Sequence, residues 1–444
     1  MTMKTSFRIY LTICLLIVFS ISASSYAPQY SEEKTNLRLR WKSGTIPISI
    51  SNSLIKLNPN MKAESDVTGA VRRSLNAWEK ASNIKFEEIV SDKQTVSPTG
   101  NFGDGVSLIT IAQTPENLLL FGKDAEEVSA ITRVFFNKKG VITEADIVLN
   151  PYQQFSTDGT IGTFDLESTL THEIGHLLGL EHSSILGATM HESNSRNGVF
   201  NLSSFDSRTL SATDISAIWS IYGVKTGEES CCGAISGKLY RADGVKPAKN
   251  YQLWAEDYDT GKVVGEFLTN NDGSFHFETL PSGKYRIYAQ NHSKAKFFRT
   301  AEEIGIAEVV KGKSVNISKK LEQLPTDFEA QYIGFNGQLS ENPITLNGGK
   351  SYTIFVGGKN INIKDYKIGF SSPFMTVSPN SRFEHDFGEN ISVISFEVRI
   401  NSQISLGEYN IYVESGKGQK SYILGGLTIE EFENPWSNYS LLNN

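Results

Sequence analysis

Three histidines within eleven residues are the side chains of this sequence whose type and spacing best suit chemistry. Residues 171–182 read THEIGHLLGLEH. His172 and His176 are four positions apart, so on a helix their imidazoles would lie one turn apart on one face and could bind one zinc ion. Gly179 can adopt the left-handed conformation that ends a helix, which would let the chain turn back and deliver His182. Three protein ligands leave a fourth position for water, as in a catalytic zinc site.

Glu173 directly follows the first of these histidines. From that position its carboxylate could reach a water on the metal without ligating the metal itself. It would act as general base, taking a proton from that water and passing it later to the leaving amine of a peptide. The expected reaction is hydrolysis of a peptide bond at one zinc ion.

The full pattern H-E-x-x-H-x-x-G-x-x-H resembles the motif of the metzincin zinc endopeptidases, and its surroundings are similar to the matrixin branch. Three further stretches carry the resemblance: 164–168, 187–190 and 210–223. Asp165 is placed as the N-cap of the zinc helix, and Met190 would form the apolar floor of a Met-turn beneath the histidines. The resemblance covers residues 36–223 and implies an α+β metzincin catalytic domain, with a twisted mixed sheet and long helices.

The elements that must position these residues can be read from apolar periodicity. A helix is expected over 65–82, because apolar residues recur at helical spacing from Val67 to Trp78. Strands are expected at 38–50, 84–89, 106–112, 130–136 and 142–149.

The strand that begins Ala130, Ile131, Thr132 has a further role if the resemblance holds. It would be the edge strand above the zinc and would accept an extended peptide substrate through main-chain hydrogen bonds. The alternative is an ordinary interior strand. The segment from His191 to about Phe205 would form the wall of the pocket beyond the cleaved bond, and His191 itself is not expected to be a ligand.

Two features that the family name suggests are not expected here. No histidine precedes His172, so a second, structural zinc has no histidine ligands before the zinc helix. No propeptide cysteine is found, so latency through a cysteine switch is not expected. Calcium remains a candidate cofactor, although its candidate ligands show no regular loop spacing. These candidates are Asp104, Asp124, Asp146 and Asp158.

Residues 1–25 read as a secretory signal peptide, with Lys4 and Arg8 ahead of an apolar core; an uncleaved anchor is the alternative. The expected product is secreted and extracellular. The missing propeptide cysteine and the accessory domain types favour a bacterial source. No later stretch reaches 18 consecutive apolar residues, and a net charge of −7 gives no footprint for nucleic acid. A monomer is expected.

The chain changes character after the catalytic part. Residues 224–232 are a linker that ends in Cys231 and Cys232, which could form a vicinal disulfide, pair between chains or stay as thiols. Residues 233–322 resemble a carboxypeptidase-regulatory-like β-sandwich, 325–430 resemble an immunoglobulin-like β-sandwich, and 431–444 read as a tail. These two all-β domains could bind a cell surface, a glycan or a protein.

The function expected from these observations is a secreted zinc endopeptidase that acts on extracellular proteins. One alternative is a secreted adhesion or binding protein whose metzincin domain is catalytically degenerate. Another is a zinc hydrolase that acts on non-peptide bonds. The intact set of His172, Glu173, His176, His182 and Met190 argues against a degenerate site.

Overall fold

The computed structural model describes most of the chain between residues 37 and 430. The described residues are 37–97, 103–122, 125–126, 128–193, 195–201, 208–228, 231–291, 300–322, 326–387 and 391–430. The expected signal peptide and the expected tail lie outside these ranges. None of the described helices is long and apolar enough to cross a membrane.

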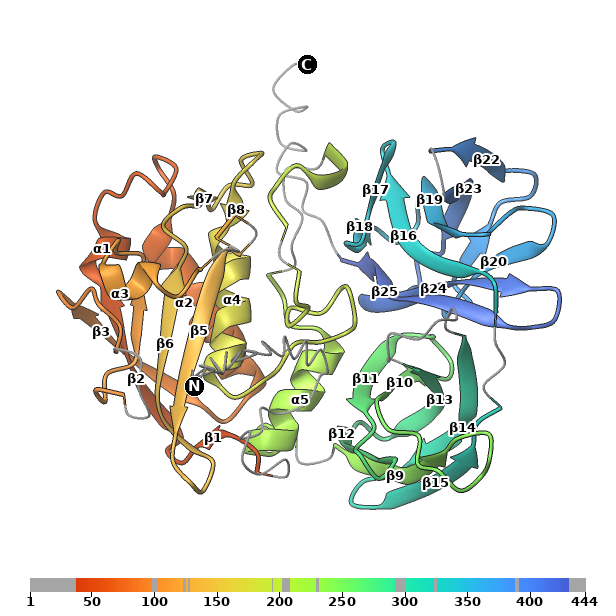
Figure 1. Ribbon diagram of the computed structural model, residues 1–444, viewed down its shortest axis with the longest axis horizontal. Helices are drawn as coiled ribbons and strands as arrows, with labels where there is room; N and C mark the ends of the chain where they lie inside the picture. Colours follow the sequence, from red (N-terminus) through yellow and green to blue (C-terminus); the bar gives the residue numbers. More distant parts are fainter. Residues whose placement is uncertain are drawn as a thin grey trace, which may run out of the picture.

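The N-terminal half is built on a six-stranded mixed sheet (Figure 1). Its strands are β1 (Arg40–Trp41), β2 (Thr45–Ser51), β3 (Lys85–Ser91), β4 (Leu108–Thr110), β5 (Ala130–Phe136) and β6 (Val141–Leu149). The order is β1-β6-β4-β2-β3, all paired in parallel, and β5 adds to β6 in the antiparallel direction. A separate short pair joins β7 (Phe155–Ser156) to β8 (Phe164–Asp165). The single strand expected over 38–50 was wrong: bends at 42–44 divide it into β1, which pairs with β6, and β2, which pairs with β3 and β4. The other expected strands are present, with small shifts at their ends.

The described helices of this half are five, with one 3-10 turn. They are α1 (Asn52–Ile55), α2 (Val67–Ala81), α3 (Pro115–Leu118), α4 (Leu166–Leu177) and α5 (Ala212–Tyr222), with η1 (Val199–Asn201) before α5. Helix α2 begins after Asp66, whose side chain caps the amide of Gly69. One hydrophobic core joins the sheet to α2 and α4, with Ile48, Ile147, Leu75, Trp78, Leu170 and Ile174 among its members.

All described elements after α5 are strands, so the C-terminal region is all-β as expected. The first group is β9 (Gly233–Tyr240), β10 (Tyr251–Asp257), β11 (Val263–Leu268), β12 (Ser274–Leu280), β13 (Gly283–Asn291), β14 (Ala301–Val309) and β15 (Ser314–Lys320). These strands form the sheets β12-β9-β15 and β11-β10-β13-β14, which enclose one hydrophobic core.

The second group encloses a core of its own. Its strands are β16 (Glu329–Phe335), β17 (Gln338–Ser340), β18 (Ile344–Leu346), β19 (Ser351–Lys359), β20 (Tyr366–Phe370), β21 (Met375–Val377), β22 (Phe383–Asp386), β23 (Ser392–Ile400), β24 (Gly407–Ser415) and β25 (Lys420–Ile429). A pairing of Ala301 with Lys420 joins β14 to β25, so one eight-stranded sheet runs through both groups. The assignment of the groups to a carboxypeptidase-regulatory-like and an immunoglobulin-like domain stays a prediction.

The all-β region packs directly on the N-terminal half. Figure 1 shows α5 between the mixed sheet and β11. The Thr279 hydroxyl of β12 donates to the Ser216 carbonyl of α5 at 2.6 Å, and Arg38 pairs with Glu278 at 2.5 Å. Between the two regions, Cys231 and Cys232 form a disulfide with their Cα atoms 3.6 Å apart.

Candidate metal centre and its surroundings

Helix α4 begins where the sequence suggested. Asp165 is its N-cap, and its carboxylate accepts a hydrogen bond from the Ser168 amide at 2.9 Å. Arg208 also pairs with Asp165, at 2.5 Å between Nη2 and Oδ2. This fixed start places His172 and His176 in the last two turns of the helix.

Gly179 ends the helical segment as expected. Its φ is +95°, and a Cβ atom at this position would lie 2.5 Å from the Leu39 carbonyl oxygen. Any residue with a side chain would have a strained backbone here, and its Cβ atom would collide with Leu39, the residue before β1. The chain reverses here, and His182 returns to the two helical histidines.

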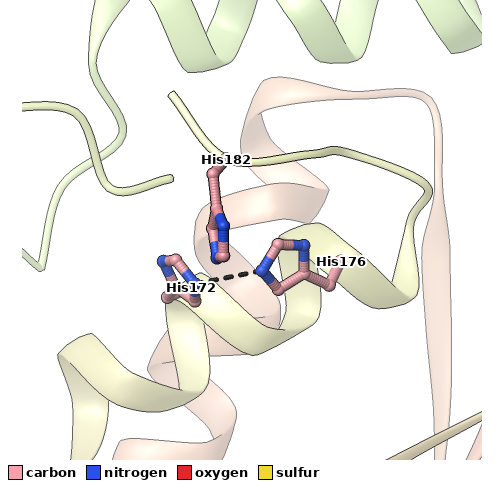
Figure 2. Close-up of side chains that lie close together, drawn as sticks. All are labelled: His172, His176 and His182. Carbon is pink, nitrogen blue, oxygen red and sulfur yellow. Dashed lines mark hydrogen bonds between the residues drawn. The ribbon is translucent and has the colours of Figure 1, made fainter. Parts of the chain in front are cut away.

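The three histidines converge on one point (Figure 2). One ligand atom from each of His172, His176 and His182 lies within 4.8 Å of the other two. The ring centroids are 4.7 Å apart for His172 and His176, 5.3 Å for His172 and His182, and 4.7 Å for His176 and His182. Within the described residues, these three histidines are the group whose potential ligand atoms lie close enough together to hold a metal ion.

Hydrogen bonds fix the tautomers of the two helical histidines. His172 Nδ1 donates to the Thr189 carbonyl at 2.8 Å, and His176 Nδ1 donates to the Leu180 carbonyl at 2.7 Å. The Nε2 atoms of these neutral rings therefore carry lone pairs, and they face each other at 3.1 Å. Two ligand nitrogens on a tetrahedral zinc lie about 3.3 Å apart. The donor set and its spacing thus fit zinc.

Burial keeps these rings neutral. It lowers the pKa of His172 well below its usual value and that of His176 to about 3, and the neighbouring imidazoles add to both effects. The pKa of His182 is also lowered by burial, against an opposing effect of Glu192. Neutral imidazole is the form that ligates a metal, so no proton has to leave before a cation is bound.

Glu173 lies beside this cluster and is only 4% exposed. Burial raises the pKa of its carboxyl to about 7, and a hydrogen bond from Thr132 opposes that rise. The Thr132 hydroxyl contacts the Glu173 carboxylate and lies 3.1 Å from the Glu173 carbonyl oxygen. A carboxyl that titrates near neutral pH is suited to accept and release a proton. This hydroxyl contact could not be predicted from the sequence, because it joins residues 41 positions apart.

Met190 lies directly beneath α4 and is fully buried. A Cβ atom on Gly175 would lie 2.2 Å from the Met190 sulfur and 2.9 Å from the Trp78 ring. The Met190 turn is held by Asp214, the third residue of α5. Its carboxylate accepts from the amides of Thr189 at 3.0 Å and Met190 at 3.3 Å. The expected Met-turn position is present, and Asp214 is a support that the sequence did not reveal.

Strand β5 lies at an edge of the sheet, and within the described residues its strand partner is β6 alone. Ala130 is buried, whereas Ile131 and Thr132 are half-buried. Thr132 reaches Glu173, so this edge passes beside the candidate catalytic carboxylate. The edge placement is as expected, and its use by a substrate stays a prediction.

The expected pocket wall is described at 191–193 and 195–201. His191 is outside the three-histidine group, and its Nδ1 accepts from the Ser193 amide at 3.2 Å. Burial, with His182 nearby, lowers the pKa of His191 to about 4. Phe200 is fully buried in the core of the second β group rather than in the catalytic half. Nothing in the Ser- and Asn-rich sequence around it indicated that anchor.

The calcium candidates have other partners where they are described. Asp104 pairs with Lys93, and Asp158 pairs with Lys62. Buried Asp146 accepts from the Ser97 and Leu108 amides at 3.2 Å each. Asp124 lies outside the described residues. Calcium binding stays a prediction.

Comparisons with known proteins agree with this geometry. The matrixin family model matches residues 40–223, less than half of the chain. Metalloendoproteinase 1 of Glycine max is 28% identical over 166 residues, covering 35% of this chain and 45% of that protein. Metalloendoproteinase 1-MMP of Arabidopsis thaliana is 32% identical over 168 residues, covering 36% and 39%. The chain thus spans less than half the length of these curated relatives.

Likenesses among solved structures are weak. The Bacteroides ovatus mixed-linkage glucan utilization locus SGBP-B gives a TM-score of 0.16 at 14% identity, covering 41% of this chain and 38% of that one. Domains 4 and 5 of the S-layer protein SbsC give 0.14 at 12% identity, covering 40% and 76%. Scores this low carry no argument about fold or function. The family match is the stronger finding: residues 40–223 match the matrixin model, and both plant relatives are metalloendoproteinases.

Proposed function

We propose that this protein is a secreted zinc-dependent endopeptidase that hydrolyses peptide bonds in extracellular proteins. The observation that carries the proposal is the convergence of His172, His176 and His182 with the buried carboxylate of Glu173 beside them. Secretion rests on the signal-like sequence of residues 1–25. The accessory β groups would decide where the enzyme acts, by binding a cell surface, a glycan or a protein.

Zinc would be held by the three imidazoles and, when bound, would supply a Lewis acid that lowers the pKa of water and polarises the scissile carbonyl. The protein's own contribution begins with Glu173. Its carboxylate takes a proton from the attacking water and returns it to the nitrogen of the departing amine. Thr132 orients that carboxylate through its hydroxyl, and Met190 packs beneath the helix that bears it.

Substrate would bind along β5. Within the described residues β5 pairs as a strand with β6 alone, so its other edge can offer main-chain N–H and C=O groups to an extended peptide. Pairing through the main chain requires no particular side chain, so selection would fall to the segment 191–201. The bound peptide would then pass beside Glu173, because Thr132 joins the strand to that residue.

Replacing Glu173 with alanine tests the assignment. We expect Glu173→Ala to lower kcat on casein by about 10²–10⁴-fold while still binding one zinc per chain, because the carboxylate moves a proton and is not a ligand. Zinc content by elemental analysis and cleavage by gel assay would be measured together. In the parent, a chelator should abolish cleavage and added zinc should restore it. Undiminished hydrolysis by the variant would overturn the mechanism, and a zinc-loaded parent that cuts nothing would favour the adhesion alternative.

A further inference from the structure

The short loop that follows the third histidine, residues 183–188, is held by the all-β region as well as by its own domain. Ser183 is tied to the Met190 turn, its amide donating to the Met190 carbonyl at 2.7 Å. The hydroxyls of Ser183 and Ser184 instead face β11, where both donate to the carboxylate of Glu266. The residue that directly precedes this contact is His182.

Glu266 gathers several donors into one buried site. It is 5% exposed, and it accepts from the Ser183 hydroxyl, from the Ser184 hydroxyl at 2.5 Å and from the Ser184 amide at 3.2 Å. Gln252 of the neighbouring strand β10 donates to it at 2.7 Å. A buried carboxylate with this many donors is held firmly, and it holds its donors in turn. Burial raises its pKa to about 7, and the serine hydrogen bonds oppose that rise.

The second β group closes the other side of the loop. The Leu186 amide donates to the Leu424 carbonyl of β25 at 2.9 Å. Ile185 is fully buried in a cluster with Trp254 and Tyr422, one from each β group. A Cβ atom on Gly187 would lie 2.5 Å from the Thr428 hydroxyl, so the backbones approach as closely as glycine permits.

We infer that Glu266 is a positioning residue for the metal centre, holding His182 in place through Ser183 and Ser184. The inference rests on the proposed function, because it concerns the third ligand of the proposed zinc site. His172 and His176 lie on the helix α4, whose backbone hydrogen bonds hold them in place. His182 lies in the turn after the helix and has no such support. Loss of a partner that hydrogen-bonds a ligand directly typically weakens metal affinity 10–100-fold. Glu266 acts one step further out, through Ser183 and Ser184, so its effect should lie at the low end of that range. The all-β region is thereby part of the catalytic apparatus.

The test is zinc affinity of the full chain, measured by competition with a chromophoric chelator. We expect Glu266→Ala to raise the zinc dissociation constant about 10-fold. Glu266→Gln should stay within about threefold of the parent, because its amide oxygen accepts from Ser184 and its amide nitrogen can donate to Ser183. At saturating zinc, Glu266→Ala should regain most of the parent's activity, although its affinity for zinc stays lower.

Glu256→Ala is the matched control. Glu256 is another buried glutamate of the same sheet, 2% exposed, whose carboxylate accepts from Trp254 at 3.0 Å and Asn410 at 2.6 Å. Its loss should lower the melting temperature and leave the zinc dissociation constant unchanged. A merely structural role for Glu266 would make the two variants behave alike.

Ser184→Ala keeps the test decisive if Glu266→Ala does not fold. This half-buried residue contributes one hydroxyl, and its removal should weaken zinc binding about threefold while β11 stays intact. Zinc affinity within error of the parent in every variant that folds would overturn this inference alone. A parent chain that binds no zinc would overturn the proposed function and this inference with it.

Discussion

The hydroxyl of Thr132 illustrates how much of the site depends on single residues outside the motif. It contacts the carboxylate of Glu173, the residue proposed to move the proton. A buried carboxylate without a donor is free to rotate and is harder to ionise. In the proposed mechanism Thr132 would therefore have two roles, as part of the substrate edge and as the residue that holds the base in place.

Thr132→Val should separate the two proposed roles, because valine keeps the shape of threonine and lacks the hydroxyl. We expect kcat to fall about 10-fold with KM and zinc content little changed, since orientation of a general base is part of its catalytic contribution. Steady-state kinetics on a fluorogenic peptide would measure the split. Thr132→Ser, which keeps the hydroxyl, should retain most of the activity. Equal losses in both variants would assign the effect to packing of the strand.

The sequence predicted which side chains lie together where they are close along the chain, and the structure brings His172, His176 and His182 into one cluster. His172, Glu173, His176 and His182 lie within eleven positions, and helical geometry alone brings three of them to one place. The contacts that orient them could not be read in the same way. Thr132, Asp214 and Glu266 reach the site from other elements, and only the tertiary fold reveals such partners.

Among the elements, η1 has a position that its sequence hides. Phe200 adopts a φ of +56° and buries its ring in the core of the second β group. Asn336 of the same group donates to the Phe200 carbonyl at 2.7 Å, and Asn342 donates to the Ser195 hydroxyl at 2.6 Å. The segment expected to line the pocket is thus anchored in a different hydrophobic core from the one that packs around the zinc helix.

Phe200→Ala should loosen that anchor. Loss of a fully buried phenylalanine destabilises a core by roughly 3–5 kcal/mol, so we expect the second β group to melt earlier in calorimetry. Val199→Ala is the natural comparison, because Val199 packs on the same core but is only partly buried. Its effect should be much smaller. Matching melting curves for the two variants would show that the Phe200 ring is not a core residue in solution.

Element boundaries were predictable to within a few residues wherever periodicity was strong. The helix expected over 65–82 is observed at Val67–Ala81, and the strand expected over 130–136 has those bounds. The order of strands in the sheet was beyond such reasoning, because pairing is set by contacts distant in sequence. So was the shared sheet, in which Ala301 meets Lys420.

Buried glutamates in the all-β region make the stability of the whole molecule depend on pH. Burial raises the pKa of Glu408 to about 8, opposed by Lys262, and its Oε2 has no hydrogen-bond partner among the described residues. Burial likewise raises the pKa of Glu256 to about 7. Such groups are protonated in the folded protein at a pH where they ionise in the unfolded chain. Their contribution to stability is complete below the unfolded pKa, near 4.5, and is lost as pH rises through 7–8.

Glu408→Gln should remove part of this dependence, because an amide does not ionise. At pH 5 we expect melting temperatures close to the parent, and at pH 8.5 the variant should melt roughly 3 °C higher. Scanning fluorimetry across this range would measure both. Glu397→Gln should give no alkaline gain, since hydrogen bonds from Ser378 and Arg399 lower the pKa of Glu397. Parallel curves for parent and Glu408→Gln would mean that Glu408 is already ionised in the folded protein.

The bond between Leu186 and Leu424 has a consequence for the order of events on the ribosome. A chain emerges from its N-terminus, and early domains fold first. Residues 166–182 are made long before β25 (Lys420–Ile429). This strand supplies the hydrogen-bond partner of Leu186 in the loop 183–188. A nascent chain can therefore form the helix with its two histidines but cannot complete the surroundings of the third. The hydrogen bond from Leu186 to Leu424 therefore forms only after β25, the last described strand, has been made.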